Sequence, residues 1–406
     1  MGQTRWDKVE GREKNMRIEK ADRLKNLPPY LFAEIDRLKK EAIDRGRDVI
    51  DLGVGDPDQP TPPHIIEALY EAAKDPANHR YALDLGLARL REAIATWYER
   101  RFGVHLDPEK EVLPLIGSKE GIAHIPLAFV NSGDVVLIPD PCYPPYRAGT
   151  IFAGGQPRSM PLLAEDGFLP DLGKIKGRIA RRAKLMFLNY PNNPTASVAP
   201  LDFFREVVTF AASHDIIVCH DGAHTEIAYD GYRPPSFLQA EGARDVGVEF
   251  HSLSKTYNMT GWRLGFLSGN HDVIEGLRKV KSNIDSGIFR AIQLAGCAAL
   301  QGPQDHLVGL IRLYRERRDV LVDGLASLGW KLSKPKATFY VWAKPPSSHN
   351  SAQLARLLLE QADVVVTPGV GFGANGEGYI RMALTVEKER LKEAVKRIGE
   401  FHKSGK

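Results

Sequence analysis

The stretch HSLSKTYNMTGWRLGF, residues 251–266, places one lysine among hydroxyl groups and an arginine: Ser252, Ser254, Lys255 and Arg263. A lysine amine attacks a carbonyl only when it is neutral, whereas a free lysine is protonated at neutral pH. Burial and nearby positive charge favour the neutral amine, and hydroxyl groups with an arginine suit a phosphate. The stretch predicts a reactive lysine beside a phosphate site; a surface lysine near a serine-rich turn is the alternative.

Two more candidate groups follow strand-like runs. The loop GSKEG (residues 117–121) opens a predicted helix, so its N–H groups and Ser118 could hold a phosphate, although such loops often only turn the chain. Asp221 closes the apolar run IIVCHD, where an unpaired carboxylate would be costly, so it should face a cation. A helix N-cap or a buried ion pair is the alternative for Asp221.

An amide and an aromatic ring complete the group. Asn193 in NYPNNPT could donate to a ligand oxygen or only form a tight turn, and Tyr143 in DPCYPPY could stack on a ring or pack into the core. Together the residues offer an amine for an aldehyde, a carboxylate for a pyridinium, an amide for a phenolate and a nest for phosphate. That combination fits pyridoxal 5′-phosphate (PLP) bound through a lysine Schiff base.

The elements that must position these residues alternate between apolar strands and helices up to about residue 300. Continuous apolar strands separated by helices predict a mostly parallel sheet covered on both faces, with ligands at the carboxyl ends of the strands. After residue 300 a long helix and short strands predict a smaller α+β domain. We expect a disordered extension at 1–15, an N-terminal arm and part of the small domain at 16–60, a large PLP-binding domain at 61–300 and a C-terminal small domain at 301–406.

Composition narrows the class of protein. The 406 residues carry a formal net charge of +4 without a basic stripe, which argues against nucleic acid as a partner. Three widely spaced cysteines, Cys142, Cys219 and Cys297, form neither a disulfide framework nor a metal-ligand pattern. No apolar run has the length of a membrane span. We therefore expect a cytoplasmic protein with reduced thiols and no metal site.

Eight motifs resemble the fold-type-I, class I/II aminotransferases of the aspartate aminotransferase superfamily, over nearly the whole chain from Met16. They are GVGDPD, RYALDLG, GSKEG, DPCYPPY, NYPNNPT, HDGAH, SLSKTYNMTGWR and YIRMALT. In detail the sequence looks most similar to the LL-diaminopimelate aminotransferases and their near relatives. The resemblance implies an enzyme of amino-acid metabolism that uses PLP and forms a homodimer with shared active sites, its N-terminal segment around NLPPYLF helping to cover each site.

The resemblance also implies a role for each matching residue. Lys255 forms the Schiff base and moves the proton, Asp221 keeps the ring nitrogen protonated, Asn193 binds the phenolate oxygen and Tyr143 stacks on the ring. Arg381 grips the substrate carboxylate, helped by Gly55 and Asn193. The remaining cofactor-binding residues, mostly at the phosphate, are Gly117, Ser118, Lys119, Ser252, Ser254 and Arg263, with Tyr81 reaching in from the partner subunit.

Two positions depart from the family pattern. His224 stands where the family usually has a tyrosine that donates to the phenolate oxygen, and imidazole titrates near neutral pH. Gly222 could give His224 room. Ala196 stands where NNPT is usually followed by glycine; at positive φ it would cost about 1 kcal/mol, and otherwise the change is benign.

These departures leave more than one function open. We expect transamination from an amino acid, with LL-diaminopimelate as a candidate donor, to a 2-oxo acid. The alternative is redirected chemistry from a quinonoid, by elimination, replacement or carbon–carbon bond formation, with His224 as an added acid or base. A non-catalytic binding protein is a remote third reading, since Lys255, Asp221, Asn193 and Arg263 are all present.

Overall fold

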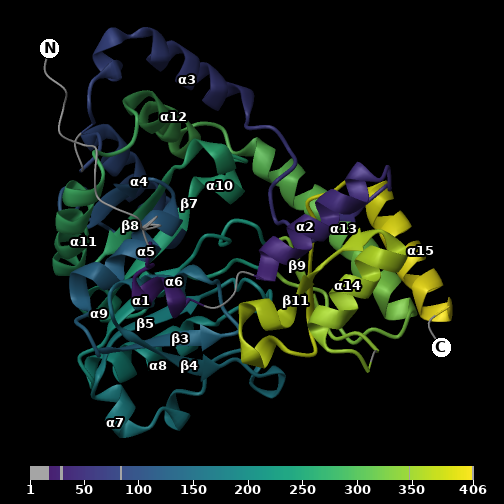
Figure 1. Cartoon of the computed structure of the whole chain (residues 1–406). Coiled ribbons are helices and arrows are strands. Elements are labelled where there is room, and N and C mark those ends of the chain that lie inside the picture. The colour runs from purple at the N-terminus through teal and green to yellow at the C-terminus, as the bar shows by residue number, and fades with distance from the viewer. Residues whose placement is uncertain (1–17, 28–30, 83–84, 347, 405–406) are drawn as a thin grey trace, which may run out of the picture.

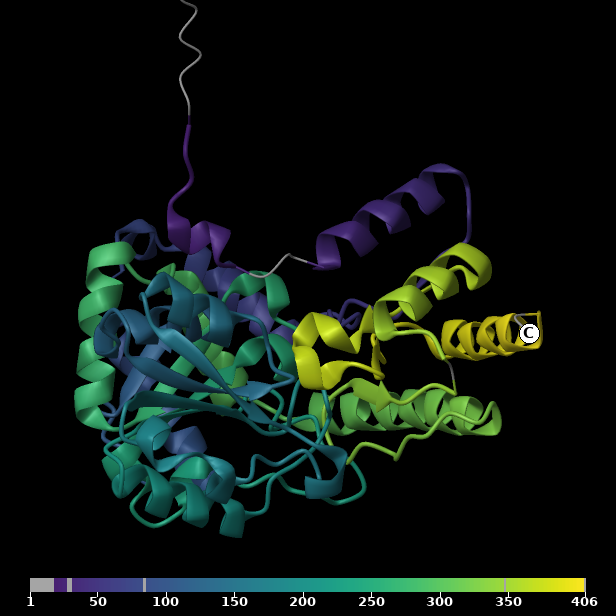
Figure 2. The ribbon, with the colours of Figure 1, turned by 60° about the horizontal axis from the view of Figure 1, so that its bottom comes forward.

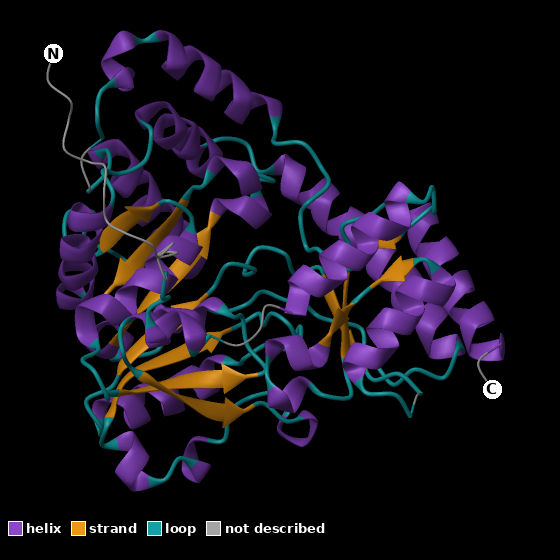
Figure 3. Ribbon diagram, in the orientation of Figure 1, coloured by secondary structure: helices purple, strands orange, loops and turns teal. Residues whose placement is uncertain are grey.

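A seven-stranded sheet lies at the centre of the larger part of the molecule, in a computed structural model that describes residues 18–27, 31–82, 85–346 and 348–404 (Figures 1 and 3). All neighbouring strands run parallel except β8, which is antiparallel to both of its neighbours, so the predicted mostly parallel sheet is confirmed. In spatial order the strands are β2 (Val112–Leu115), β8 (Gly265–Gly269), β7 (Gly247–Ser252), β6 (Ile217–Asp221), β5 (Ala183–Asn189), β3 (Val135–Asp140) and β4 (Gln156–Pro161).

Helices cover both faces of this sheet, which explains why its central strands are apolar along their whole length. One face packs against α5 (Ser118–Phe129), α6 (Pro145–Phe152) and α11 (His271–Ile284). The other face packs against α4 (Ala88–Phe102), α8 (Leu201–Ala212) and α12 (Arg290–Gln301), and α3 (Pro63–Lys74) lies on α12 (Figure 1).

The smaller part contains an antiparallel sheet of three short strands, in the order β11 (Thr367–Pro368), β12 (Ile380–Ala383) and β9 (Tyr340–Ala343). Beside it β1 (Ile50–Asp51) pairs in parallel with β10 (Val364–Val365), which brings the N-terminal region onto the C-terminal region. The helices of this part are α2 (Leu31–Asp44), α13 (Asp305–Ser327), α14 (Ser351–Ala362) and α15 (Lys388–Ser404), which lie beside one another in Figure 2. The smaller α+β domain is thus present, while the residue boundaries given above remain predictions.

Short helices complete the chain: α1 (Asp22–Lys25), α7 (Gly177–Ala180), α9 (Ala243–Val246) and α10 (Leu253–Thr256). No described helix is long and apolar enough to cross a bilayer. The expected extension at 1–15 lies outside the described residues, as do residues 28–30 of the segment expected to cover the site.

The register of the sheet explains how distant motifs meet. Gly265 at the start of β8 pairs with Leu115 on one side and with Ser252 on the other, so β2 and β7 end at the same edge. On the next pair along, Phe250 of β7 lies opposite Asp221 at the end of β6. The loop after β2, the end of β6 and the turn carrying Lys255 therefore share one edge.

Ala196 adopts φ = +56°, the left-handed conformation in which a Cβ is strained. We expect the substitution Ala196→Gly to raise the free energy of unfolding by about 1 kcal/mol, because glycine removes that strain. Denaturant unfolding of the two proteins measures the difference. Ala199→Gly is the matched control, since Ala199 is buried but does not have positive φ, and it should lower stability instead. Equal destabilisation by both changes would contradict the expected strain.

Candidate active site

A cavity of about 430 Å³ lies at the shared strand edge and extends to the small domain. Ten of the predicted site residues line it: Ser118, Lys119, Tyr143, Asn193, Asp221, His224, Ser252, Ser254, Lys255 and Arg263. The remaining lining residues, which the sequence analysis did not single out, are Asp56, Asn189, Ala223, Thr260 and Tyr340. Residues from six separate sequence motifs thus converge on one cavity.

Lys255 lies on α10, and its Nζ donates a hydrogen bond of 3.2 Å to the carbonyl of Gly55. Burial lowers the pKa of Lys255 to about 8; the nearby Asp56 opposes this change, and Arg381 and Arg263 add to it. A substantial fraction of the amine is therefore neutral near physiological pH, as an attack on a carbonyl requires.

The lowered pKa of Lys255 predicts a specific pH dependence. The rate at which the cofactor-free protein condenses with pyridoxal phosphate should rise about tenfold per pH unit and level off above pH of about 8, since only the neutral amine reacts. Stopped-flow absorbance over a pH series measures this rate. A free lysine derivative is the control, and its rate should keep rising toward pH of about 10. A protein rate that also rose to pH 10 would contradict the perturbed amine.

The predicted phosphate side of the cavity combines a helix N-terminus with a cation. Helix α5 begins at Ser118, and the N–H groups of Ser118 and Lys119 have no acceptor within the helix, whereas that of Glu120 donates to the carbonyl of Gly117 at 3.2 Å. Gly117 has φ = +71°, and a Cβ there would collide with the guanidinium of Arg263. Arg263 donates to the carbonyl of Thr260 at 2.8 Å and forms no ion pair with a described residue. The arrangement leaves a cation and free N–H groups for an anion.

Asp221 ends β6 as a buried carboxyl group. Tyr146 donates to its Oδ2 at 2.7 Å, and the backbone N–H of Ala223 donates to its Oδ1 at 3.1 Å. Burial raises the pKa of Asp221, while the Tyr146 hydrogen bond opposes that rise. No described lysine or arginine pairs with the carboxylate, so the place of a cationic partner is free. The sequence analysis missed Tyr146, although it lies three residues after Tyr143, in the first turn of α6.

His224 is buried at the wall of the cavity, with its ring against those of Phe339 and Tyr340 at centroid distances of 5.1 and 5.5 Å. Its Nδ1 is buried and has no hydrogen-bond partner within the described part of the chain. Burial lowers the pKa of His224 to about 3, and the charges of Lys255 and Arg381 act in the same direction. The imidazole is therefore neutral, and Nδ1 lacks a partner that a bound group could supply.

Arg381 lies on β12 with a buried guanidinium between the rings of Tyr340 and Phe372, at 4.2 and 4.7 Å from their centroids. It donates to Oδ1 of Asn193 at 2.8 Å and to the carbonyl of Gly53 at 2.7 Å. Among the described residues its buried Nε has no hydrogen-bond partner, and no carboxylate pairs with the guanidinium. A buried arginine with an unused donor is suited to a carboxylate ligand.

Tyr340 is a cavity residue that sequence reasoning did not find. Its hydroxyl lies so close to Gly55 that any side chain at position 55 would collide with it. The strand of Tyr340 comes from the small domain, whereas Lys255, which bonds to Gly55, comes from the large sheet region. Gly55 therefore lets the two parts approach at the cavity, which no local sequence pattern indicates.

Tyr81 lies away from the cavity of its own chain and is 87% exposed. Its backbone carbonyl accepts a hydrogen bond of 3.3 Å from Arg290, which also donates to the carbonyl of Ala77. The loop that carries Tyr81 is thus fixed while the aromatic side chain projects from the molecule.

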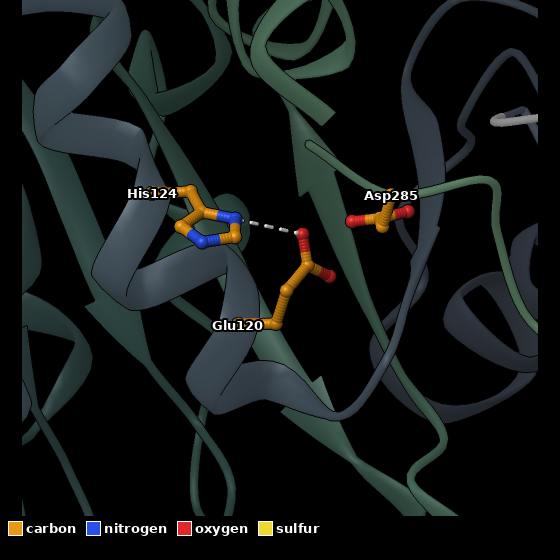
Figure 4. A group of neighbouring side chains, drawn as sticks. All are labelled: Glu120, His124 and Asp285. Atoms are coloured by element: carbon orange, nitrogen blue, oxygen red, sulfur yellow. Dashed lines mark hydrogen bonds and ion pairs between the residues drawn. The ribbon is translucent and has the colours of Figure 1, made fainter. Parts of the chain in front are cut away.

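Figure 4 shows Glu120, His124 and Asp285, a group whose atoms lie close enough together to hold a metal ion. His124 Nδ1 lies 3.2 Å from Oε1 of Glu120. The fully buried ammonium of Lys281, however, lies 2.7 Å from Oδ1 of Asp285 and 3.4 Å from Oε2 of Glu120. Lys281 already supplies the positive charge between the two carboxylates, so the group is explained as an internal ion-pair cluster.

Comparison with known proteins decides the family. The family model for aminotransferase class I and II matches residues 47–398. The chain is a class I and II aminotransferase. As such it is an enzyme that uses pyridoxal 5′-phosphate and acts on amino acids and 2-oxo acids, and it has the fold-type-I transferase fold.

Individual relatives of this aminotransferase match over nearly their full length. An LL-diaminopimelate aminotransferase of Moorella thermoacetica is 60% identical over 381 residues, covering 94% of this chain and 98% of the relative. One from Syntrophobacter fumaroxidans is 59% identical over 383 residues, with 94% and 99% covered. Among solved structures, substrate-bound BacF from Bacillus subtilis superposes with a TM-score of 0.91 at 43% identity, covering 95% of this chain and 98% of that one.

The cavity of this aminotransferase fits pyridoxal phosphate on its own chemistry. It offers a lysine with a lowered pKa, a buried carboxylate without a described cationic partner, a helix N-terminus beside an arginine, and the unpartnered Nδ1 of His224. These groups match the aldehyde, ring nitrogen, phosphate and ring oxygen of the cofactor. When bound, pyridoxal phosphate supplies the carbonyl that takes up the amino group and the ring that withdraws electrons from it.

Proposed function

We propose that this aminotransferase uses LL-diaminopimelate as its amino donor and a 2-oxo acid as its acceptor. The observation that carries the proposal is the 60% identity, over 94% of the chain, to a relative named LL-diaminopimelate aminotransferase. Further relatives with the same name are 53% to 59% identical over 93% to 94% of the chain.

A second cavity supports a donor that carries a carboxylate at its far end. It measures about 940 Å³ and is bordered by residues on either side of Tyr143 and by Phe372, whose ring packs on Arg381. Among the described residues no Asp or Glu lines this cavity, whereas three arginines do: Arg23, Arg147 and Arg158. These arginines form no ion pair with a described residue. The far end of LL-diaminopimelate is a second amino-acid group, and guanidinium groups are suitable partners for its carboxylate.

In this proposal Lys255 is the residue that moves the proton. Its Nζ takes the proton from the α-carbon of the bound amino acid and returns it to the carbon that receives the amino group. Asp221 holds a proton on the cofactor ring nitrogen, and Tyr143 stacks on the ring. His224 and Asn193 contact the ring oxygen, with His224 neutral.

The phosphate is held by the first turn of α5, by Arg263 and by the hydroxyl-rich turn before Lys255. The contributing residues are Gly117, Ser118, Lys119, Ser252, Ser254 and Arg263. Arg381 binds the α-carboxylate of donor and acceptor alike, with its free Nε and the surrounding Gly55 and Asn193 completing the contact.

Redirected chemistry through His224 is not favoured. Burial lowers the pKa of His224 to about 3, which disfavours the protonated imidazole that an added general acid would need. The relatives with full-length matches are also named aminotransferases.

We also propose that the enzyme is a cytoplasmic homodimer in which Tyr81 completes the partner's site. Tyr81, Phe289 and Ile284 are exposed apolar side chains, and the ring of Phe289 lies 6.4 Å from that of His79 on the Tyr81 loop. Three described cysteines are free thiols, in keeping with a reducing compartment.

Mixing two inactive variants tests the shared site. Lys255→Met and Tyr81→Ala should each lower activity in separate samples, and mixing with exchange of subunits should restore part of it. A mixed dimer then contains one site with both residues intact. Each variant mixed only with itself is the control. No recovery, in a mixture shown by mass spectrometry to contain mixed dimers, would contradict a contribution of Tyr81 across the interface.

The donor proposal is tested by single-turnover absorbance of the loaded enzyme with LL-diaminopimelate, glutamate and an amino acid with an apolar side chain. We expect LL-diaminopimelate to convert the enzyme to the pyridoxamine form, and a 2-oxo acid to reverse the change. In Arg147→Gln the concentration of LL-diaminopimelate that gives half the maximal rate should rise about tenfold, while that of the apolar donor should stay the same. Conversion by every donor except LL-diaminopimelate would refute the substrate, and loss of the amino acid without any pyridoxamine form would revive the redirected chemistry.

A further inference from the structure

Tyr146 contacts the carboxylate of Asp221 and is held in a fixed orientation. It is fully buried on α6, and its ring stacks on that of Phe187 at a centroid distance of 4.9 Å and an interplanar angle of 12°. Its hydroxyl donates to Oδ2 of Asp221 at 2.7 Å. The stacked ring leaves the hydroxyl little freedom to turn elsewhere.

The ionisation of Asp221 depends on few groups. Burial favours its neutral form, and the Tyr146 hydroxyl is the leading described group that favours the carboxylate. The N–H of Ala223 is the other donor, and Oδ1 accepts it. No described lysine or arginine pairs with Asp221, but positive charge on His220 or His251 would also lower its pKa. The hydrogen bond from Tyr146 is therefore the largest of several described contributions that favour the carboxylate before a cation binds.

We propose that Tyr146 is a positioning residue for the cofactor ring: it holds Asp221 ionised and oriented so that the carboxylate binds a protonated ring nitrogen. The inference rests on the proposed contact between Asp221 and that nitrogen. Tyr146 does not itself touch the cofactor in this arrangement; it acts through Asp221. The alternative is a buried tyrosine that only fills the space between α6 and β5.

The two readings differ in whether the effect of the hydroxyl depends on the ring nitrogen. The test compares the affinity of cofactor-free protein for pyridoxal phosphate and for its analogue with C–H in place of the ring nitrogen. Tyr146→Phe should bind pyridoxal phosphate about tenfold to hundredfold more weakly, as expected for a lost hydrogen bond to a charged group. Its affinity for the analogue should match that of the unchanged protein.

Tyr229→Phe is the matched control. Tyr229 is also buried, and its hydroxyl donates to the carbonyl of Thr338 at 2.6 Å, away from Asp221. It should leave both affinities unchanged. A second readout is the absorbance of the bound cofactor against pH, whose acid transition should move to higher pH in Tyr146→Phe. Without the donor the pKa of Asp221 rises, so the carboxylate is protonated earlier as the pH falls.

Each outcome decides between the readings when Asp221→Ala is measured beside Tyr146→Phe. Selective weakening for pyridoxal phosphate in both variants supports the proposal. Weakening in Asp221→Ala alone, or equal weakening of pyridoxal phosphate and analogue in Tyr146→Phe, overturns the role of Tyr146 and leaves that of Asp221 intact. Unchanged affinity in Asp221→Ala would remove the contact on which the proposal depends.

Discussion

Replacing Lys255 with methionine is expected to lower the rate of amino-group transfer by about 10²- to 10⁴-fold, the usual contribution of a positioned proton-transfer group. Nζ of Lys255 is the amine with a lowered pKa in the cavity, and it lies 3.2 Å from the carbonyl of Gly55. Methionine keeps the length and apolar stem of the side chain but has no proton acceptor. Single-turnover absorbance of the loaded variant with the amino donor measures the remaining rate.

The control for this loss is Lys184→Met, which removes an exposed lysine from β5 in the same sheet and should leave the rate unchanged. In the smaller variant Lys255→Ala, an added primary amine should restore part of the rate, because it can enter the vacated space and accept the proton. A Lys255→Met rate within threefold of the unchanged enzyme would show that another group moves the proton.

The architecture was predictable because its signals are local and repeated. Strands such as β3 and β5 read as continuous apolar runs between amphipathic helices, and only a sheet covered on both faces buries them. The residues that end these runs must then meet at one edge of the sheet. The sequence alone therefore predicted that Asp221 and Lys255 lie close together. The antiparallel direction of β8 had no such signal, since an apolar run does not encode strand direction.

Site residues that belong to a recognisable motif could be predicted from the sequence. Site residues that reach the cavity only through tertiary packing could not. Lys255, Asp221 and Arg263 stand within recognisable motifs, and all three line the cavity. Tyr340 reaches the cavity because the small domain places its hydroxyl against Gly55, a contact between residues 285 positions apart. Ala196 was predicted to be strained only if φ were positive, and that angle required coordinates.

His224 illustrates the same limit in electrostatics. Its sequence position suggested an imidazole that titrates near neutral pH, but burial against Phe339 and Tyr340 and the charges of Lys255 and Arg381 lower its pKa to about 3. The identity of a histidine is local, whereas its protonation depends on groups from three other segments of the chain.

Replacing Arg381 with methionine is expected to lower kcat/KM by about 10²- to 10³-fold for the amino acid and for the 2-oxo acid. The guanidinium is buried between Tyr340 and Phe372 and has an unused Nε, so its loss would leave a substrate carboxylate in an apolar place without a cation. Removing one partner of a buried ion pair costs about 3 to 5 kcal/mol. Steady-state kinetics with each substrate varied in turn measures both values.

Loss of Arg381 should lower kcat/KM equally for the amino donor and for the 2-oxo acid acceptor, because both present an α-carboxylate. Arg381→Lys tests the geometry: it keeps the charge but loses the planar pair of donors, so most of the deficit should remain. Affinity for pyridoxal phosphate in the absence of substrate should change little in either variant, since Arg381 is assigned to the substrate. A deficit confined to the amino donor would place Arg381 at the far end of that donor, and a matching loss of cofactor affinity would assign it to the cofactor instead.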